Sequence, residues 1–131
     1  MLRHPLLLLL AASLVPLAVS ACGGDDGPKR LTIDDNDSSV EISTADTFEV
    51  VLEGNPTTGF GWIVEEGDAA IVEVTGEPSF EPQSDLVGAP GEFTFVFEGK
   101  SPGTTTLVLN YRRSFETAPP EQTFSVTVTV E

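Results

Sequence analysis

The residue types that usually carry out enzyme chemistry are scarce in this chain. Its only histidine, His4, and its only cysteine, Cys22, both lie close to the N-terminus of a chain of 131 residues. The N-terminal features described below predict that His4 is cleaved off and that the Cys22 thiol carries a lipid. The remaining chain can then form no Ser–His or Cys–His nucleophile and offers no soft ligand for zinc. Most hydrolase chemistry is therefore excluded, and we expect neither a metal site nor a cofactor.

Carboxylates are present in large excess, with 21 Asp plus Glu against 6 Lys plus Arg and a formal net charge of −15. A pair of them could act as acid and base, as in glycosidases, but acids at this density form such pairs by chance. Asp34, Asp35, Asn36 and Asp37 could offer oxygens to Ca²⁺, yet the segment lacks the glycine and the downstream glutamate of an EF-hand loop. We interpret it as a solvated turn. The negative charge also repels nucleic acid, so no nucleic-acid partner is expected.

The N-terminal residues have the features of an export signal. Arg3 precedes an apolar run that is shorter than the roughly 20 residues of a membrane-spanning helix. The following Val19-Ser20-Ala21-Cys22 resembles a bacterial lipoprotein signal, in which the cysteine thiol receives the lipid. The alternative is an ordinary signal peptide with an incidental cysteine. We expect residues 1–21 to be removed and Cys22 to anchor the protein outside the cytoplasmic membrane.

The remainder divides into a tether and one domain. Residues 22–30 are rich in glycine and charge, which is typical of a flexible linker between a lipid and a domain. Residues 31–131 have the size of a single domain with a modest core. Because Cys22 is the only cysteine, no intrachain disulfide can form. We expect a monomer.

Apolar and polar residues alternate in several short segments of residues 31–131, and turn residues separate these segments. No segment shows a helical repeat. Seven or eight such strands predict an all-β fold, an immunoglobulin-like antiparallel β-sandwich with Trp62 in its core. The segment Ile71–Phe80 contains Gly76 and Pro78, so we expect one bent strand or two short ones there. The other expected strands are Leu31–Ile33, Val40–Ile42, Thr47–Glu53, Phe60–Val64, Phe93–Phe97, Leu107–Tyr111 and Phe124–Val130.

Successive connections in an antiparallel sandwich alternate between its two ends. Counted from the strand Thr47–Glu53, the connections Gly54–Gly59, Glu81–Gly91 and Arg112–Glu121 should therefore share one end. The connections at the opposite end read as plain turns. Distinctive loops on a rigid scaffold are typical of a binding surface.

The first of these loops contains Asn55-Pro56-Thr57-Thr58-Gly59-Phe60, with Trp62 two residues later. Pro56 stiffens the loop, and Gly59 supplies a backbone shape that other residues reach only at a cost. This segment resembles the most diagnostic loop of the chagasin-type inhibitors of papain-like cysteine proteases. The resemblance implies an immunoglobulin-like sandwich whose three loops plug a protease cleft. The alternative is that these residues merely make a good hairpin turn.

The other two loops match the family less closely. In the second loop, Pro90 stands where the family commonly has another glycine, and in the third loop Ser114 replaces the usual proline. By residue order, Arg113 and Phe115 correspond to the arginine and the aromatic of that third loop. Their alternative interpretation is a cation that balances an acidic surface and a ring that folds back onto the sandwich. The resemblance assigns protease binding to Asn55, Pro56, Thr57, Thr58, Gly59, Phe60, Gly88, Ala89, Pro90, Gly91, Arg113, Ser114 and Phe115.

These features predict a reversible, non-covalent inhibitor of papain-like cysteine proteases that is not itself an enzyme. By the resemblance, Thr57 and its neighbours would occupy the region of the catalytic cysteine while the other loops grip the cleft on either side. The competing hypothesis is a non-catalytic surface interaction or adhesion module with the same sandwich fold.

Overall fold

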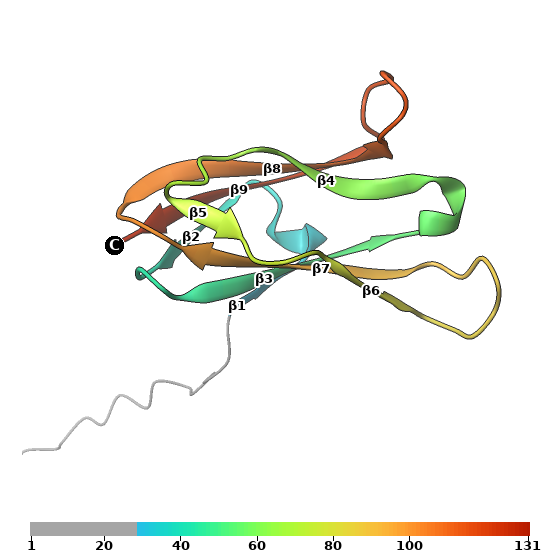
Figure 1. Ribbon diagram of the computed structural model, residues 1–131, viewed down its shortest axis with the longest axis horizontal. Coiled ribbons are helices and arrows are strands. Elements are labelled where there is room, and N and C mark those ends of the chain that lie inside the picture. The colour runs from blue at the N-terminus through green and yellow to red at the C-terminus, as the bar shows by residue number, and fades with distance from the viewer. Residues whose placement is uncertain (1–28) are drawn as a thin grey trace, which may run out of the picture.

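The structure is a computed structural model that describes residues 29–131 (Figure 1). The predicted signal peptide, Cys22 and residues 23–28 of the predicted tether lie outside the described residues. Lys29 and Arg30, which the composition assigned to the tether, instead begin the first strand, β1 (Lys29–Leu31). They belong to the sheet because Lys29 and Arg30 pair with Phe48 and Glu49 of strand β3.

The described residues form nine strands and two short 3-10 helices. The segment Ile71–Phe80 is interrupted by Gly76, at φ +68°, and leads into two short strands, which is one of the two outcomes expected for it. No helix in residues 29–131 is long and apolar enough to span a membrane. In chain order the remaining elements are η1 (Ile33–Asp35), β2 (Ser38–Ile42), β3 (Thr47–Gly54), η2 (Pro56–Thr58), β4 (Phe60–Glu66), β5 (Val72–Val74), β6 (Ser79–Pro82), β7 (Gly91–Gly99), β8 (Gly103–Arg113) and β9 (Gln122–Val130).

Two sheets pack face to face, which confirms the predicted sandwich (Figure 1). One sheet has the order β1-β3-β7-β5, with β6 also paired to β7, and the other has the order β2-β9-β8-β4. The pairings β1–β3 and β2–β9 are parallel, where an entirely antiparallel sandwich was expected. The difference arises because the N-terminal segment crosses between the layers and adds one edge strand to each sheet.

The acidic segment 34–37 makes the turn at which this crossing occurs. Asp34 and Asp35 lie in η1, which Thr32 caps. The Asn36 side-chain oxygen accepts the Ser125 backbone N–H at 2.8 Å, and the Asp37 N–H donates to the Ser125 carbonyl at 2.7 Å. The segment therefore joins η1 to β9. No group of three potential metal-ligating side chains occurs in the part of the chain that the structure describes.

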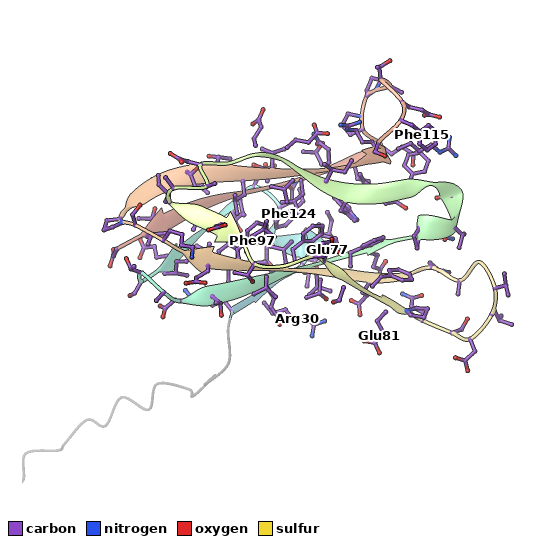
Figure 2. The ribbon with its side chains drawn as sticks, viewed as in Figure 1. Arg30, Glu77, Glu81, Phe97, Phe115 and Phe124 are labelled. Atoms are coloured by element: carbon purple, nitrogen blue, oxygen red, sulfur yellow. The ribbon has the colours of Figure 1, made fainter. Side chains whose placement is uncertain are left out.

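The core lies between the sheets and is made of the inward-facing residues, which alternate with outward-facing ones along the strands. Phe97 and Phe124, from opposite sheets, are almost completely buried there (Figure 2). Trp62 is 5% exposed, which confirms its predicted core position. Its indole Nε1 donates to the Glu53 carbonyl at 3.0 Å, so burial leaves this donor satisfied.

The three distinctive connections share one end of the sandwich, as predicted. We call residues 55–59 loop 1, residues 83–90 loop 2 and residues 114–121 loop 3. Figure 1 shows all three on the right, while the turns β2–β3 and β7–β8 lie on the left. The scaffold thus carries its irregular segments at one end and its short turns at the other.

Candidate functional site

Loop 1 is held in shape by bonds among its own residues. Asn55 caps the short helix η2: its side-chain oxygen accepts the N–H and the hydroxyl of Thr57 at 3.1 and 2.6 Å. The Thr58 hydroxyl donates to the Asn55 carbonyl at 2.6 Å. Gly59 ends the turn at φ +83°, a conformation that costs little only for glycine, and its N–H donates to the Pro56 carbonyl at 3.1 Å. The motif therefore defines a closed turn.

The base of loop 1 rests on buried aromatic residues. The Asn55 backbone N–H donates to the phenolic oxygen of Tyr111 at 2.8 Å. The Tyr111 ring is buried and lies 5.2 Å, centroid to centroid, from the rings of both Phe60 and Trp62. Phe60, which was predicted to contact a protease, is thus half-buried beneath the loops. Its contacts give it a supporting role.

Loop 2 connects β6 to β7 and is tied directly to loop 1. The Asn55 side-chain NH₂ donates to the Gly88 carbonyl at 3.0 Å, and Gly88 has φ +83°. At the tip of the loop, Leu86 is 78% exposed and Val87 is fully exposed. Sequence reasoning did not select these two residues as site residues. The available signal was a pair of large apolar residues in a segment with no strand alternation.

The four predicted residues of loop 2 differ in their surroundings. Gly88 and Pro90 are exposed and Ala89 is half-buried. Gly91 is buried as the first residue of β7, where it pairs with Gly54 on one side and Pro82 on the other. A Cβ on Gly91 would overlap the Glu81 carbonyl, so the structure gives this glycine a packing role at the base of the loop.

Loop 3 is tied to loop 1 through Arg113. The Arg113 Nε donates to the Thr58 carbonyl at 2.9 Å, and the guanidinium carbon lies 4.5 Å above the Phe60 ring. Its Nη1 also forms an ion pair with Glu116 at 3.2 Å. These contacts use most of the side chain within the protein. Arg113 joins two loops rather than extending freely as an anchor.

Phe115 has the opposite character, because this residue of loop 3 is 74% exposed (Figure 2). A Cβ placed on Gly59 would lie 3.5 Å from the edge of this ring, so Phe115 reaches over loop 1. Ser114 is exposed as well. The ring does not fold back onto the sandwich, which favours the anchor interpretation of this residue.

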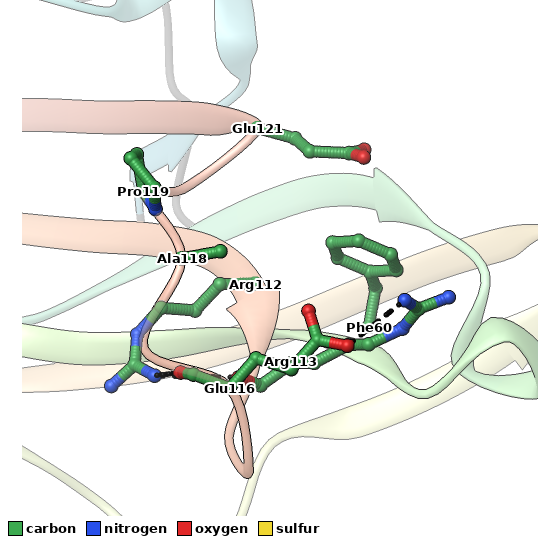
Figure 3. Close-up of a pocket in the computed structure, with 7 residues that line it drawn as sticks. All are labelled: Phe60, Arg112, Arg113, Glu116, Ala118, Pro119 and Glu121. Carbon is green, nitrogen blue, oxygen red and sulfur yellow. Dashed lines mark hydrogen bonds and ion pairs between the residues drawn. The ribbon is translucent and has the colours of Figure 1, made fainter.

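A second arginine holds loop 3 from the outer face of the sheet. Arg112 Nε is bonded to the Glu65 carboxylate. Its Nη1 contacts the carbonyls of Arg113 and Glu116 at 3.4 and 3.3 Å, and Figure 3 shows Arg112 beside Glu116. The Asn110 amide also donates to Glu65, at 2.8 Å. These hydrogen bonds, from Asn110 and then Arg112, hold the pKa of Glu65 below its ordinary value.

The cavity under loop 3 is small. It has a volume of about 170 Å³ and is formed by the side chains of the loop and its supports (Figure 3). Pockets that enclose small molecules usually measure roughly 300–1,000 Å³. The end of the sandwich is therefore a protruding surface. The residues that line the cavity are Phe60, Arg112, Arg113, Glu116, Ala118, Pro119 and Glu121.

This surface is suited to insertion into a partner. The three most exposed large apolar side chains of residues 29–131 are Leu86, Val87 and Phe115, all on loops 2 and 3. Loop 1 is bonded to both of these loops, through Asn55 to loop 2 and through Arg113 to loop 3. Exposed apolar groups on a stiff, cross-linked support are typical of binding anchors.

Comparison with known proteins agrees with this geometry. Residues 41–129 match the family described as "Chagasin family peptidase inhibitor I42". The chain is 31% identical to Amoebiasin-1 of Entamoeba histolytica over 103 residues, which cover 77% of this chain and 98% of that relative.

Two solved structures extend the comparison. The fold is similar to the crystal structure of a cysteine protease inhibitor, EhICP2, from Entamoeba histolytica, with a TM-score of 0.70 and 25% identity over 80% of this chain and 100% of that one. It also resembles PbICP-C, solved in complex with falcipain-2, with a TM-score of 0.57. At 22% identity over 79% of this chain and 91% of that one, this second likeness concerns the fold alone. The match over 41–129 shows that the chain belongs to the chagasin family and is a peptidase inhibitor, not an enzyme.

Proposed function

We propose that this protein is a reversible, non-covalent inhibitor of papain-like cysteine proteases, and that loops 1, 2 and 3 enter the active-site cleft together. The observation that carries the proposal is the clustering of Leu86, Val87 and Phe115 around loop 1 at one end of the sandwich. One chain supplies all three loops, so we propose that it acts as a monomer.

Loop 1 is the part best suited to approach the catalytic thiolate. A substrate lies extended in a protease cleft, whereas the bonds of Asn55 and Gly59 keep this segment in a closed 3-10 turn. Its peptide bonds therefore cannot adopt the extended shape in which a substrate is cleaved. Thr57 and Thr58 are both exposed, so loop 1 can cover the thiolate without serving as a substrate.

Loops 2 and 3 would supply the grip on either side of loop 1. Leu86, Val87 and Phe115 can bury apolar area against the walls of the cleft, which is the main source of affinity at such interfaces. A wedge of this kind would bury about 1,600 Å², the standard area of a specific interface. Because the loops are already cross-linked, little conformational entropy is lost on binding.

The test is inhibition of papain by the purified protein and by matched variants. We expect the parent to inhibit, and Thr57→Trp to raise the inhibition constant about a hundredfold because the ring blocks close approach of loop 1. Pro102→Trp, in the exposed turn between β7 and β8 at the opposite end, should leave the inhibition constant unchanged. Pro102→Trp should unfold within about 0.5 kcal/mol of the parent, as exposed substitutions usually do. Thr57→Trp also loses the hydroxyl bond to Asn55, so its free energy of unfolding should fall by about 1 kcal/mol at most.

Two results would contradict this proposal. Equal inhibition by the parent and Thr57→Trp would exclude the wedge, even if papain is inhibited. A parent that does not inhibit papain at all would favour the surface interaction module instead.

We further propose that the protein is exported and that Cys22 carries the lipid that anchors it outside the cytoplasmic membrane. The support is the apolar run and the small residues Ser20 and Ala21 that precede the only cysteine. Cys22→Ser should release the protein from the membrane fraction or leave an unprocessed precursor. A Cys22→Ser protein that is processed and remains anchored would refute the lipid site.

A further inference from the structure

The turn that presents Phe115 is fixed from outside loop 3. The Glu116 N–H donates to the Arg113 carbonyl at 3.1 Å, so residues 113–116 form a β-turn with Ser114 and Phe115 at its centre. Arg112 Nη1 lies against both ends of this turn, at the carbonyls of Arg113 and Glu116. The position of Phe115 therefore depends on where the Arg112 guanidinium is held.

Glu65 is the residue that holds this guanidinium. It occupies a bulge in β4, where the pairing with β8 shifts between Val64 and Glu66. A bulge changes the direction of a side chain relative to a regularly paired strand. Here the Glu65 carboxylate reaches Arg112 Nε on β8. The two side chains are only 28% and 29% exposed. The bond joins two ionised groups, and such charge-assisted hydrogen bonds are stronger than those between neutral groups.

Glu65 is itself fixed by a chain of side chains across the sheet. Its second oxygen accepts the Asn110 amide at 2.8 Å, and the Asn110 oxygen accepts the Thr123 hydroxyl, also at 2.8 Å. Thr123 lies on β9, Asn110 on β8 and Glu65 on β4. Three strands of the scaffold thus determine the position of one carboxylate, which determines the position of Arg112.

We propose that Glu65 is a positioning residue for protease binding: through Arg112 it presets the turn 113–116 and so holds Phe115 ready for the cleft. This inference rests on the proposed function. Glu65 lies on the edge strand β4, and its hydrogen bonds go to Asn110 and Arg112 of β8, so its effect on binding acts through Arg112. Without Glu65, no carboxylate holds the Arg112 guanidinium against the turn. Phe115 then has to be ordered when the protease binds, which costs conformational entropy.

The experiment compares Glu65→Ala with Glu73→Ala, which removes the same charge on β5 and breaks an ion pair with Lys100. Inhibition of papain should be about fivefold weaker for Glu65→Ala and unchanged for Glu73→Ala. The exchange of the Glu116 amide hydrogen, which reports on the turn without any protease, should become faster only in Glu65→Ala. Glu65→Gln keeps one oxygen that can accept from Arg112, and its effects should be smaller.

Double mutants separate positioning from a general structural role. If Glu65 acts through Phe115, then Glu65→Ala should weaken inhibition less than about twofold in a Phe115→Ala background, because the anchor is already gone. In a Leu86→Ala background, the full fivefold effect should remain. Equal effects in both backgrounds would overturn the proposal, since they would indicate a general loss of structure.

The proposal and the proposed function can fail separately. Unchanged inhibition together with unchanged Glu116 exchange in Glu65→Ala would overturn the role of Glu65 while the parent still inhibits papain. A parent that does not inhibit papain would overturn the protease-binding role as well as the proposed function, and the exchange rates would then decide only the ordering of the turn. If Glu65→Ala does not fold, the same criteria apply to Glu65→Gln.

Discussion

Loops 1 and 3 lie side by side and are both held firmly, but their shapes have different origins. Loop 1 is shaped by residues within the loop: Asn55 caps the turn, Pro56 begins it and Gly59 ends it. Loop 3 is shaped by Arg112 and Glu65, which are 47 residues apart in the chain. Residues within loop 1 fix its conformation, whereas side chains of the sheet fix the conformation of loop 3.

This difference has a consequence for tolerance to substitution. A change at Asn55 removes several bonds of loop 1 at once, and no other element can replace them. Loop 3 has Ser114 where the family resemblance leads one to expect a proline, yet the Glu116 N–H closes the turn on the Arg113 carbonyl and Arg112 lies against both of its ends. A locally encoded loop is therefore sensitive to its motif, whereas a loop held from the sheet can lose a motif residue and keep its shape.

The largest expected effect comes from breaking loop 1 with Asn55→Ala. The change removes the cap on η2 and the link to the Gly88 carbonyl, so loops 1 and 2 lose their relative position. We expect the inhibition constant for papain to rise about a hundredfold and the free energy of unfolding to fall by about 1 kcal/mol, the usual cost of a lost cap. Ser39→Ala, an exposed change on β2, is the control and should alter neither value. An Asn55→Ala protein that inhibits like the parent would show that loop 1 is not locally encoded.

A smaller effect should follow when loop 3 is given a local constraint of the kind that loop 1 has. Ser114 is the second residue of the turn 113–116, a position at which proline is favoured. Ser114→Pro should stabilise the turn and strengthen inhibition about threefold. It should also reduce the effect of Glu65→Ala, because the turn would no longer depend on Arg112. Weaker inhibition by Ser114→Pro would indicate that the backbone at this residue is incompatible with proline.

The smallest expected effect is a dependence on pH that loop 3 has and loop 1 lacks. Hydrogen bonds from Asn110 and Arg112 lower the pKa of Glu65 from 4.5, so the native state favours the charged carboxylate. Its contribution to stability is therefore present above the unfolded pKa of 4.5 and is lost as the pH falls through the lower native pKa.

Urea unfolding between pH 7 and pH 3 provides the measurement. The difference in stability between the parent and Glu65→Gln should shrink as the pH falls below 4.5. Asn55 carries no charge, so the difference between the parent and Asn55→Ala should not change over this range. A constant difference for Glu65→Gln would mean that the carboxylate is not held in its charged form.

Local patterns in the sequence were sufficient for the sandwich, the burial of Trp62 and the shape of loop 1. Alternation with a period of two marks a strand wherever it occurs, and the cap, proline and glycine of a turn act within a few residues. Even the shared end of the three loops follows from counting connections along the chain. These features follow from patterns that can be read directly along the chain.

The way the loops are joined, and the side chains that remain exposed, could be seen only in the folded protein. Leu86 and Val87 read as ordinary apolar residues until the hairpin β6–β7 places them at a tip, and Gly91 reads as a loop glycine until packing buries it. Arg113 turns inward because the register of β4 and β8 sets it opposite Phe60. Cross-strand register and the bulge at Glu65 result from packing the whole sheet, so no short segment of the sequence specifies them.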